Sequence, residues 1–134
     1  MKAVAAQTGL VVVTHGQIGR AMIEVAEFIL GQSLAAIRFV SFRQSAMEKT
    51  GDDEIRLAID SADQGCGVLV MTDIGGASPS NYVARLLPLA HVAMVSGLNL
   101  AMLIRVWSYR GKPLRQLVKL ATDGAMRDIM EYKK

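Results

Sequence analysis

The chain has 134 residues, a length typical of one domain, and 51% of them are hydrophobic, which excludes an intrinsically disordered chain. No apolar run approaches the roughly 20 residues of a membrane-spanning helix. The net charge is +3, and the basic residues are scattered and not interleaved with aromatic residues, so the sequence does not indicate nucleic-acid binding.

The first predicted element is an apolar, β-branched strand that begins at Gly9 and ends at a polar, glycine-flanked His15. Helical spacing of apolar residues predicts a helix over 18–30, with Gly31 as its C-terminal cap. Alternating polarity predicts a strand over 36–42, with one face more exposed. We expect the apolar face of the helix to comprise Ile18, Met22, Val25, Ala26, Ile29 and Leu30.

The middle of the sequence repeats this strand pattern. Thr50 and the acidic residues after it predict a helix start, and Gly65 follows the end of that helix. A second apolar strand over 67–71 runs into Thr72 and Asp73, which glycines follow, as they do after His15. The strand ends are therefore the first place to look for function.

The last part of the chain alternates in the same way. Ser78 and Pro79 predict the start of a helix that ends before Pro88. The remaining predicted elements are a strand over 91–95, a helix over 100–109, and a helix that opens at Pro113 and closes at Gly124. The last ten residues fit no single element, although Ile129-Met130-Glu131-Tyr132 could add an edge strand.

Strands that alternate with helices predict an α/β fold for a single domain over residues 1–134. We expect a three-layer sandwich with a mostly parallel four-stranded sheet and helices on both faces. The stretch 129–132 could add an antiparallel strand at the edge.

The candidate chemistry lies at the ends of the first and third strands. If these strands are parallel neighbours, Asp73 can accept a hydrogen bond from one ring nitrogen of His15. The other ring nitrogen then keeps a lone pair and can act as a nucleophile. The helix that follows His15 presents N–H groups suited to an anionic product.

Other residues near these strand ends suit a phosphate. Ser78 and the N–H groups at the helix start, together with Asn81, could hold phosphate oxygens, and glycines allow close approach of the backbone. Each residue also has an ordinary explanation as a turn, a cap or a solvated side chain. A His–Asp pair could bind a metal, but no third ligand of suitable type is near in the sequence. The candidate phosphate-binding residues are Gly16, Gly75, Gly76, Ser78 and Asn81.

Three blocks of sequence carry a resemblance to a known family: 10–16, 68–81 and 95–103. In this order they resemble the enzyme IIA domain of the mannose family of the bacterial phosphoenolpyruvate-dependent sugar phosphotransferase system. The resemblance covers nearly the whole chain from about Gly9. Gly-Gly-Ala-Ser-Pro at 75–79 is most similar to stand-alone proteobacterial members.

The resemblance implies catalytic roles for three residues. His15 would accept a phosphoryl group from the phosphocarrier HPr and pass it to a IIB protein, Asp73 would orient His15, and Ser78 would lie near the phosphate. It also implies a homodimer, no metal or organic cofactor, and contact with the membrane only through a permease complex.

Two alternatives remain open. One is a regulatory module whose docking on a partner protein depends on the phosphorylation of His15, without sugar transport. The other is a hydrolase using His15, Asp73 and Ser78, which lacks a Gly-x-Ser-x-Gly motif. The single cysteine, Cys66, excludes an internal disulfide, and together with the absence of a recognisable signal peptide in residues 1–7 it predicts a cytoplasmic protein.

Overall fold

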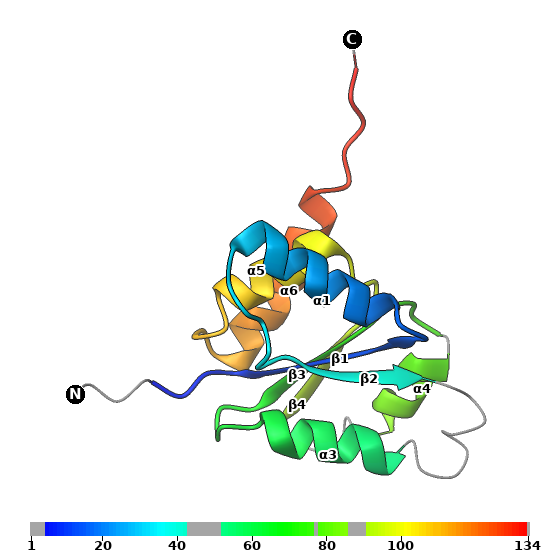
Figure 1. Cartoon of the computed structure of the whole chain (residues 1–134), viewed down its shortest axis with the longest axis vertical. Coiled ribbons are helices and arrows are strands. Elements are labelled where there is room, and N and C mark those ends of the chain that lie inside the picture. Colours follow the sequence, from blue (N-terminus) through cyan, green and yellow to red (C-terminus); the bar gives the residue numbers. More distant parts are fainter. Residues whose placement is uncertain (1–4, 43–51, 77, 86–90, 134) are drawn as a thin grey trace.

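The computed structural model describes residues 5–42, 52–76, 78–85 and 91–133, and in that part of the chain strands alternate with helices (Figure 1). The strands are β1 (Gly9–His15), β2 (Arg38–Phe42), β3 (Val68–Thr72) and β4 (Val92–Val95). The helices are α1 (Ile18–Leu30), α3 (Asp52–Ala62), α4 (Ser78–Ala84), α5 (Leu100–Ser108) and α6 (Leu114–Arg127). The predicted order of elements is confirmed. Thr50, the predicted cap of α3, lies outside the described residues.

All four strands are parallel, in the order β2-β1-β3-β4. The two central strands, β1 and β3, pair in a register that sets Gly9 opposite Val68 and Val13 opposite Thr72. Their carboxyl ends therefore lie at the same edge of the sheet, as the sequence predicted.

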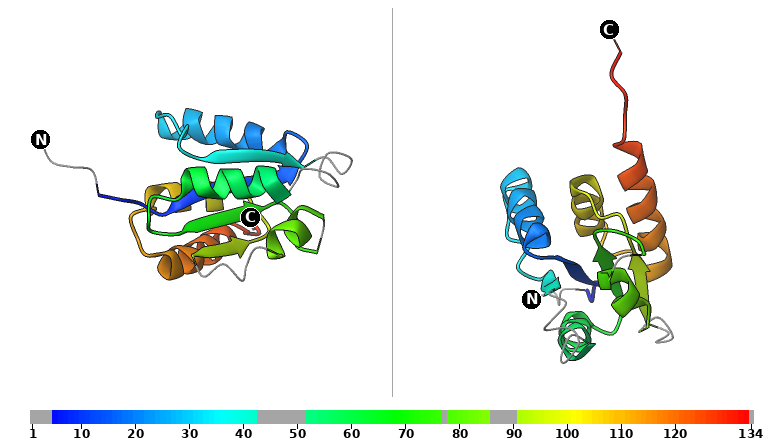
Figure 2. Two further views of the ribbon diagram at one scale, coloured as in Figure 1. Left: turned by 90° about the horizontal axis from the view of Figure 1, so that it is seen from below. Right: turned by 90° about the vertical axis from the view of Figure 1, so that its right-hand side faces the viewer.

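The sheet separates two hydrophobic clusters, one on each face. Leu10 and Val12 of β1 pack with α1, α5 and α6, whereas Val11 and Val13 pack on the opposite face with α3 and α4. Figure 2 shows these two helical layers on either side of the sheet. Because side chains alternate between the faces of a strand, β1 and β3 are buried on both sides, which explains their continuous apolar sequences. The α/β three-layer fold is confirmed.

Helix α1 ends as predicted, at Gly31 in a left-handed conformation, where the N–H of Gly31 donates to the carbonyl of Glu27. Its predicted apolar face is confirmed only in part: Ala26 is buried and Met22 and Leu30 pack against the core, but Ile18, Val25 and Ile29 do not. Gly19, Ile23 and Ala26 face the core, while several apolar residues are exposed. The reason is that Gly19 lets the helix approach β1, which rotates the other apolar residues outward. The exposed apolar residues of α1 are Ile18, Val25, Phe28 and Ile29.

The predicted end of α6 at Gly124 was also wrong, because the helix continues to Arg127. Gly124 is buried within the helix, and a Cβ atom at this position would overlap with Cδ of Arg105 on α5. The glycine therefore serves the packing of α6 against α5 and does not terminate the helix.

The residues after α6, Asp128 to Lys133, leave the body of the molecule as an irregular tail and form no strand (Figure 1). The sheet of the described chain is accordingly all parallel, and the edge strand considered for residues 129–132 is not formed within one subunit. No helix in the described ranges has both the length and the apolar character needed to cross a lipid bilayer.

Candidate functional site

The pairing of β1 with β3 brings His15 and Asp73 together. His15 is the last residue of β1, and Asp73 comes directly after Thr72, the last residue of β3. The carboxylate oxygen Oδ2 of Asp73 lies 2.8 Å from Nδ1 of His15 and 3.0 Å from the backbone nitrogen of the same residue. One oxygen of one carboxylate thus fixes both the backbone and the ring of His15.

The two side chains differ in exposure. The imidazole of His15 is 45% exposed, whereas the carboxylate of Asp73 is only 10% exposed. The rings of His15 and of Phe42, at the end of β2, are in a T-shaped arrangement, with 6.0 Å between the ring centroids. The ring is therefore held by Asp73 and Phe42 while part of it remains accessible to a partner.

The environment keeps Asp73 ionised. Burial alone would raise the pKa of this carboxyl group, but hydrogen bonds from the backbone and ring of His15 and from the N–H of Ile74 together lower the pKa below its ordinary value. The N–H of Ile74 donates to Oδ1 at 3.0 Å. An ionised carboxylate can only accept hydrogen bonds, so Nδ1 of His15 carries the ring hydrogen. The lone pair is then on Nε2, the ring nitrogen that can act as a nucleophile.

The turn after His15 is fixed by neighbouring hydroxyl groups. Thr14, buried at the end of β1, accepts a hydrogen bond from the N–H of Gly19 at 2.9 Å. Ser41 of β2 donates to the carbonyl of Gly16 at 2.9 Å, and the N–H of Gly16 donates to the carbonyl of Phe42. Gly16 has a φ of +50°, which favours glycine at this turn. The direction of the chain after His15 is thus set by β2 and by the first turn of α1.

A second set of contacts fixes the loop after Asp73. Ser80, buried in α4, donates to the carbonyl of Ile74 at 2.6 Å and lies 2.6 Å from the hydroxyl of Thr72. Gly75 lies against the residue that follows β4, because a Cβ atom at this position would lie 2.8 Å from Oγ of Ser96. These contacts join the ends of β3 and β4 to α4 and hold Asp73 in place.

The structure locates the other predicted site residues as follows. Gly75 and Gly76 form the turn between β3 and α4, and Gly76 has a φ of +78°. The side-chain amide of Asn81 is exposed and donates to the carbonyl of Gly76 at 3.4 Å. Ser78 is the first residue of α4, and its side chain lies outside the described residues. The phosphate-binding roles of these residues stay predictions.

Three residues that were not predicted from the sequence also belong to this site: Ser41, Phe42 and Ser80. Ser41 and Phe42 end β2, the parallel neighbour of β1, so their position at a strand end was the available signal. Ser80 follows Ser78 and Pro79 in the first turn of α4, where a hydroxyl group usually serves as a local cap.

His91 lies apart from this site. It lies just before β4, at the amino ends of the parallel strands, whereas His15 lies at their carboxyl ends. Its Nε2 is 3.8 Å from Oδ2 of Asp63. Within the part of the chain that the structure describes, no three His, Cys, Asp or Glu side chains are grouped so that they could hold a metal ion.

Comparison with known proteins identifies the family. A family model for EIIA-man, described as the PTS system fructose IIA component, matches residues 9–119. The mannose-specific EIIAB component of the PTS from Escherichia coli strain K12 is 24% identical over 127 residues, which are 92% of this chain and 39% of that protein. The chain therefore spans well under half the length of this relative.

Two solved structures share the fold. The mannose/sorbose specific IIA subunit of the phosphotransferase system from Enterococcus faecalis superposes with a TM-score of 0.84 at 20% identity, over 96% of this chain and 97% of that chain. A putative phosphoenolpyruvate-dependent sugar phosphotransferase system permease from Klebsiella pneumoniae gives a TM-score of 0.79 at 20% identity, over 98% and 96% of the two chains. The family match includes the strand ends that carry His15 and Asp73, and the resemblance noted in the sequence is confirmed. The chain belongs to the EIIA-man family of IIA components of the phosphotransferase system.

Proposed function

We propose that this protein is a phosphohistidine carrier, a phosphotransferase in which Nε2 of His15 accepts a phosphoryl group from phospho-HPr. The observation that carries the proposal is the contact of 2.8 Å between Nδ1 of His15 and the ionised carboxylate of Asp73. This contact leaves the lone pair on Nε2 of a half-exposed ring, which is the arrangement that a nucleophilic histidine requires.

The transfer exchanges one bond to phosphorus for another. The lone pair of Nε2 forms the N–P bond as the bond between phosphorus and the donor breaks, and the donor keeps the electrons of that bond. The imidazole of His15 gains positive charge during attack, and the carboxylate of Asp73 stabilises it. No metal or organic cofactor is required, because the energy of the phosphoryl group comes from the donor.

The backbone near His15 suits the phosphoryl group that would be carried there. Gly16 and Gly76 lie in the turns that follow β1 and Asp73, and a glycine lets backbone N–H groups approach an anion closely. We include Gly75, Ser78 and Asn81 in this proposed phosphate site, because they belong to the loop and helix start beside Asp73.

Intact-mass spectrometry tests the acceptor. The protein is incubated with phosphoenolpyruvate, enzyme I and HPr, and one acid-labile phosphate is expected. His15→Ala should abolish it, whereas His91→Ala, which removes the other histidine of the chain, should leave it unchanged. A phosphate that persists in His15→Ala and maps to His91 would refute the proposal.

The onward acceptor in this proposal is a IIB component, in the cytoplasm. The relative from E. coli carries EIIAB in its name, and this chain aligns with 39% of it. Transfer of radiolabelled phosphate from the phosphorylated protein to a separately purified IIB protein of the mannose type would test this step. If His15 is phosphorylated but passes nothing to IIB, the carrier role ends at His15, and the regulatory alternative stands in its place.

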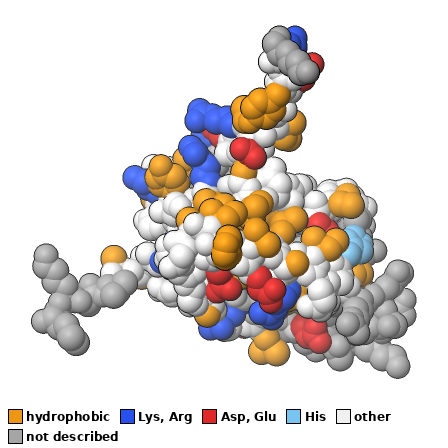
Figure 3. Space-filling model, turned by 45° about the horizontal axis from the view of Figure 1, so that its top comes forward, with side chains coloured by type: hydrophobic (Ala, Val, Ile, Leu, Met, Phe, Trp, Pro, Cys, Tyr) orange, Lys and Arg blue, Asp and Glu red, His pale blue; other side chains and the backbone are white. Residues whose placement is uncertain are grey.

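We include a homodimer in the proposal. Apolar side chains of α1, with Phe28 88% exposed, gather on one face of the molecule (Figure 3), and the tail adds the exposed Ile129, Met130 and Tyr132. The strand β4 is an edge of the sheet and could pair with the tail of a second subunit. Sedimentation equilibrium at micromolar concentration should give the mass of a dimer. Truncation after Arg127 should weaken the association of the two subunits. A monomer mass for the full chain would contradict this assembly.

A further inference from the structure

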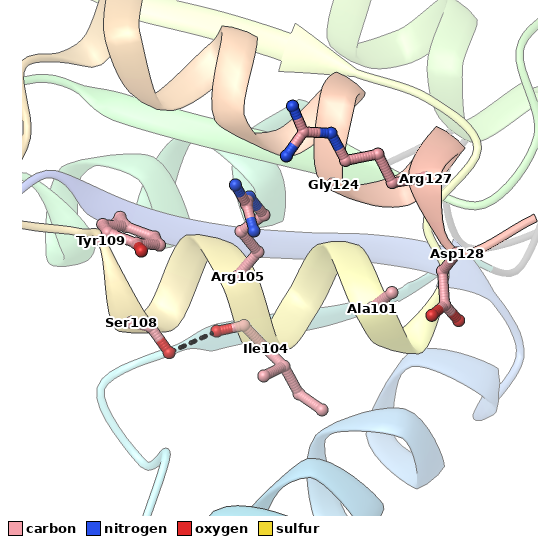
Figure 4. Close-up of a pocket in the computed structure, with 8 residues that line it drawn as sticks. All are labelled: Ala101, Ile104, Arg105, Ser108, Tyr109, Gly124, Arg127 and Asp128. Atoms are coloured by element: carbon pink, nitrogen blue, oxygen red, sulfur yellow. Dashed lines mark hydrogen bonds between the residues drawn. The ribbon is translucent and has the colours of Figure 1, made fainter.

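A cavity of about 500 Å³ lies between α5 and α6, and none of its lining residues belongs to the site at His15. Two arginines line it, Arg105 from α5 and Arg127 from the end of α6, together with Tyr109 and Ser108 (Figure 4). This volume is within the range of pockets that bind small molecules, about 300–1,000 Å³.

Arg105 is held in this cavity by an unusual packing arrangement. Its side chain crosses α6 at Gly124, where a Cβ atom would overlap with Cδ of the arginine and lie 3.0 Å from its Nε. The guanidinium carbon lies 5.5 Å from the centre of the Tyr109 ring, a distance suited to a cation–π contact. Because residue 124 is a glycine, the side chain of Arg105 can pack between the two helices.

The hydrogen bonding of Arg105 is incomplete. Its Nε atom is buried and has no hydrogen-bond partner within the described chain. A buried donor without a partner is costly, typically about 1–3 kcal/mol, and such groups are rare in folded proteins. Nε is enclosed against Gly124 and out of reach of a ligand, whereas the two terminal NH₂ groups of Arg105 are not fully buried and form no hydrogen bond with the described residues, which leaves them free to bind an acceptor in the cavity.

The charge of the cavity is positive. Neither Arg105 nor Arg127 forms an ion pair with an acidic side chain of the described residues. Asp128 also lines the cavity, but its carboxylate points away from both guanidinium groups (Figure 4). The hydroxyl of Ser108 donates to the carbonyl of Ile104 at 2.8 Å, so the side-chain donors left for a ligand are those of the two arginines and the hydroxyl of Tyr109.

We propose that this cavity binds a phosphate monoester of a small organic molecule, with its phosphate between Arg105 and Arg127. Two guanidinium groups match the charge of a phosphate dianion, and arginine binds phosphate through paired N–H donors. The cavity is larger than a phosphate ion, and the remaining space is lined by Ile104, Ala101 and the ring of Tyr109, which suit the organic part of the ligand. The site is separate from the proposed phosphoryl transfer at His15.

The test uses phenyl phosphate and inorganic phosphate as probes, with the full-length protein at constant ionic strength. Calorimetric titration should give saturable binding of phenyl phosphate, tighter than that of inorganic phosphate. In ¹⁵N–¹H spectra, the arginine Nε–H signal that Arg105→Gln removes should shift as phenyl phosphate is added. Each of Arg105→Gln and Arg127→Gln should weaken binding about tenfold or more, because a charge-assisted hydrogen bond is lost.

Two further variants control the experiment. Gly124→Ala should weaken binding, because the new methyl group displaces Arg105. Arg115→Gln, on an exposed position of α6 that does not line the cavity, should bind phenyl phosphate as the wild type does. If Arg105→Gln fails to fold by circular dichroism, Arg127→Gln, at the exposed end of the helix, still decides the outcome.

The same titration separates this site from His15. His15→Ala should retain the binding of phenyl phosphate. The proposal is overturned if His15→Ala loses binding while both arginine variants keep it, since the anion then sits at the strand ends. It is also overturned if no saturable binding occurs at concentrations up to the order of 10 mM.

Discussion

Oδ2 of Asp73 accepts two hydrogen bonds from His15, one from the backbone N–H at 3.0 Å and one from ring Nδ1 at 2.8 Å. These residues are 58 positions apart in the sequence and meet because β1 and β3 are parallel neighbours. A single carboxylate oxygen thereby couples the position of the backbone at the end of β1 to the tautomer of the ring.

Asp73→Asn should fold but transfer phosphate slowly. The amide is uncharged and cannot stabilise a positive imidazole, and its NH₂ group can favour the wrong tautomer of His15. We expect a loss of roughly a hundredfold or more in the rate of phosphoryl transfer from phospho-HPr, measured by rapid quench. Asp63→Asn, which alters the carboxylate near His91, is the matched control and should transfer at the wild-type rate. If the Asp73→Asn protein folded and transferred phosphate at the wild-type rate, Asp73 would have only a structural role in the turn.

The same aspartate should make stability depend on pH. The pKa of Asp73 is lower in the folded protein than in the unfolded chain, where it is about 3.9. Its contribution to stability is therefore present above that value and is lost as the pH falls through the folded pKa. Urea unfolding of the wild type and of Asp73→Asn should show the largest difference in unfolding free energy at pH 7 and a smaller one below about pH 4. If the difference in unfolding free energy between the two proteins increased as the pH was lowered, the lowered pKa of Asp73 would be contradicted.

Gly19→Ala should destabilise the protein, although alanine favours helices. The added Cβ atom would lie 2.7 Å from Cε1 of Phe39 and 2.7 Å from Cγ1 of Val12. Overpacking of this kind costs about 1–3 kcal/mol, which exceeds the gain in helix propensity of about 1 kcal/mol. Gly111→Ala has nothing within 4 Å of the new methyl group and should change the unfolding free energy by less than about 0.5 kcal/mol. Equal urea midpoints for the two variants would show that α1 can move away from β1 without cost.

Ser80→Ala should loosen the loop that carries Asp73. Without this hydroxyl, the buried Thr72 side chain loses its partner and the carbonyl of Ile74 loses its donor. We expect a loss of about 1–3 kcal/mol in unfolding free energy, together with slower phosphoryl transfer. Ser61→Ala, at an exposed position of α3, is the comparison and should affect neither quantity. Unchanged stability in Ser80→Ala would mean that water replaces the hydroxyl.

The sequence was sufficient to predict a mostly parallel sheet with His15 and Asp73 at strand ends, whereas their contact followed only on the assumption that the two strands are neighbours, which the structure shows. Strands such as 10–13 are apolar at every position, which identifies parallel strands covered on both faces, and parallel strands place their ends together. His15 and Asp73 are ionisable residues that each follow an apolar strand, so both could be identified as candidates from the sequence.

The remaining features depend on contacts between distant residues. Glycine usually indicates the end of a helix, and nothing near Gly124 in the sequence reveals that Arg105 crosses the helix there. Apolar spacing placed Val25 and Ile29 inside, whereas Gly19 sets the rotation of α1 through its contact with β1. The hydroxyls of Ser41 and Ser80 bond to carbonyls in other loops, and a one-dimensional pattern carries no signal for such partners.

The position of β1 between two strands that come later in the chain has a consequence for biosynthesis. A ribosome releases β1 first, but both of its neighbours, β2 and β3, emerge afterwards, and Asp73 emerges after β3. Pairings between distant segments form slowly. The nascent chain therefore carries His15 without its carboxylate while the 58 residues up to Asp73 are added. The backbone amide of His15 reports the moment of assembly, because its hydrogen is bonded to Asp73 and not to a neighbouring strand. In pulse-labelled hydrogen exchange during refolding, this amide should become protected together with β3 and later than α1.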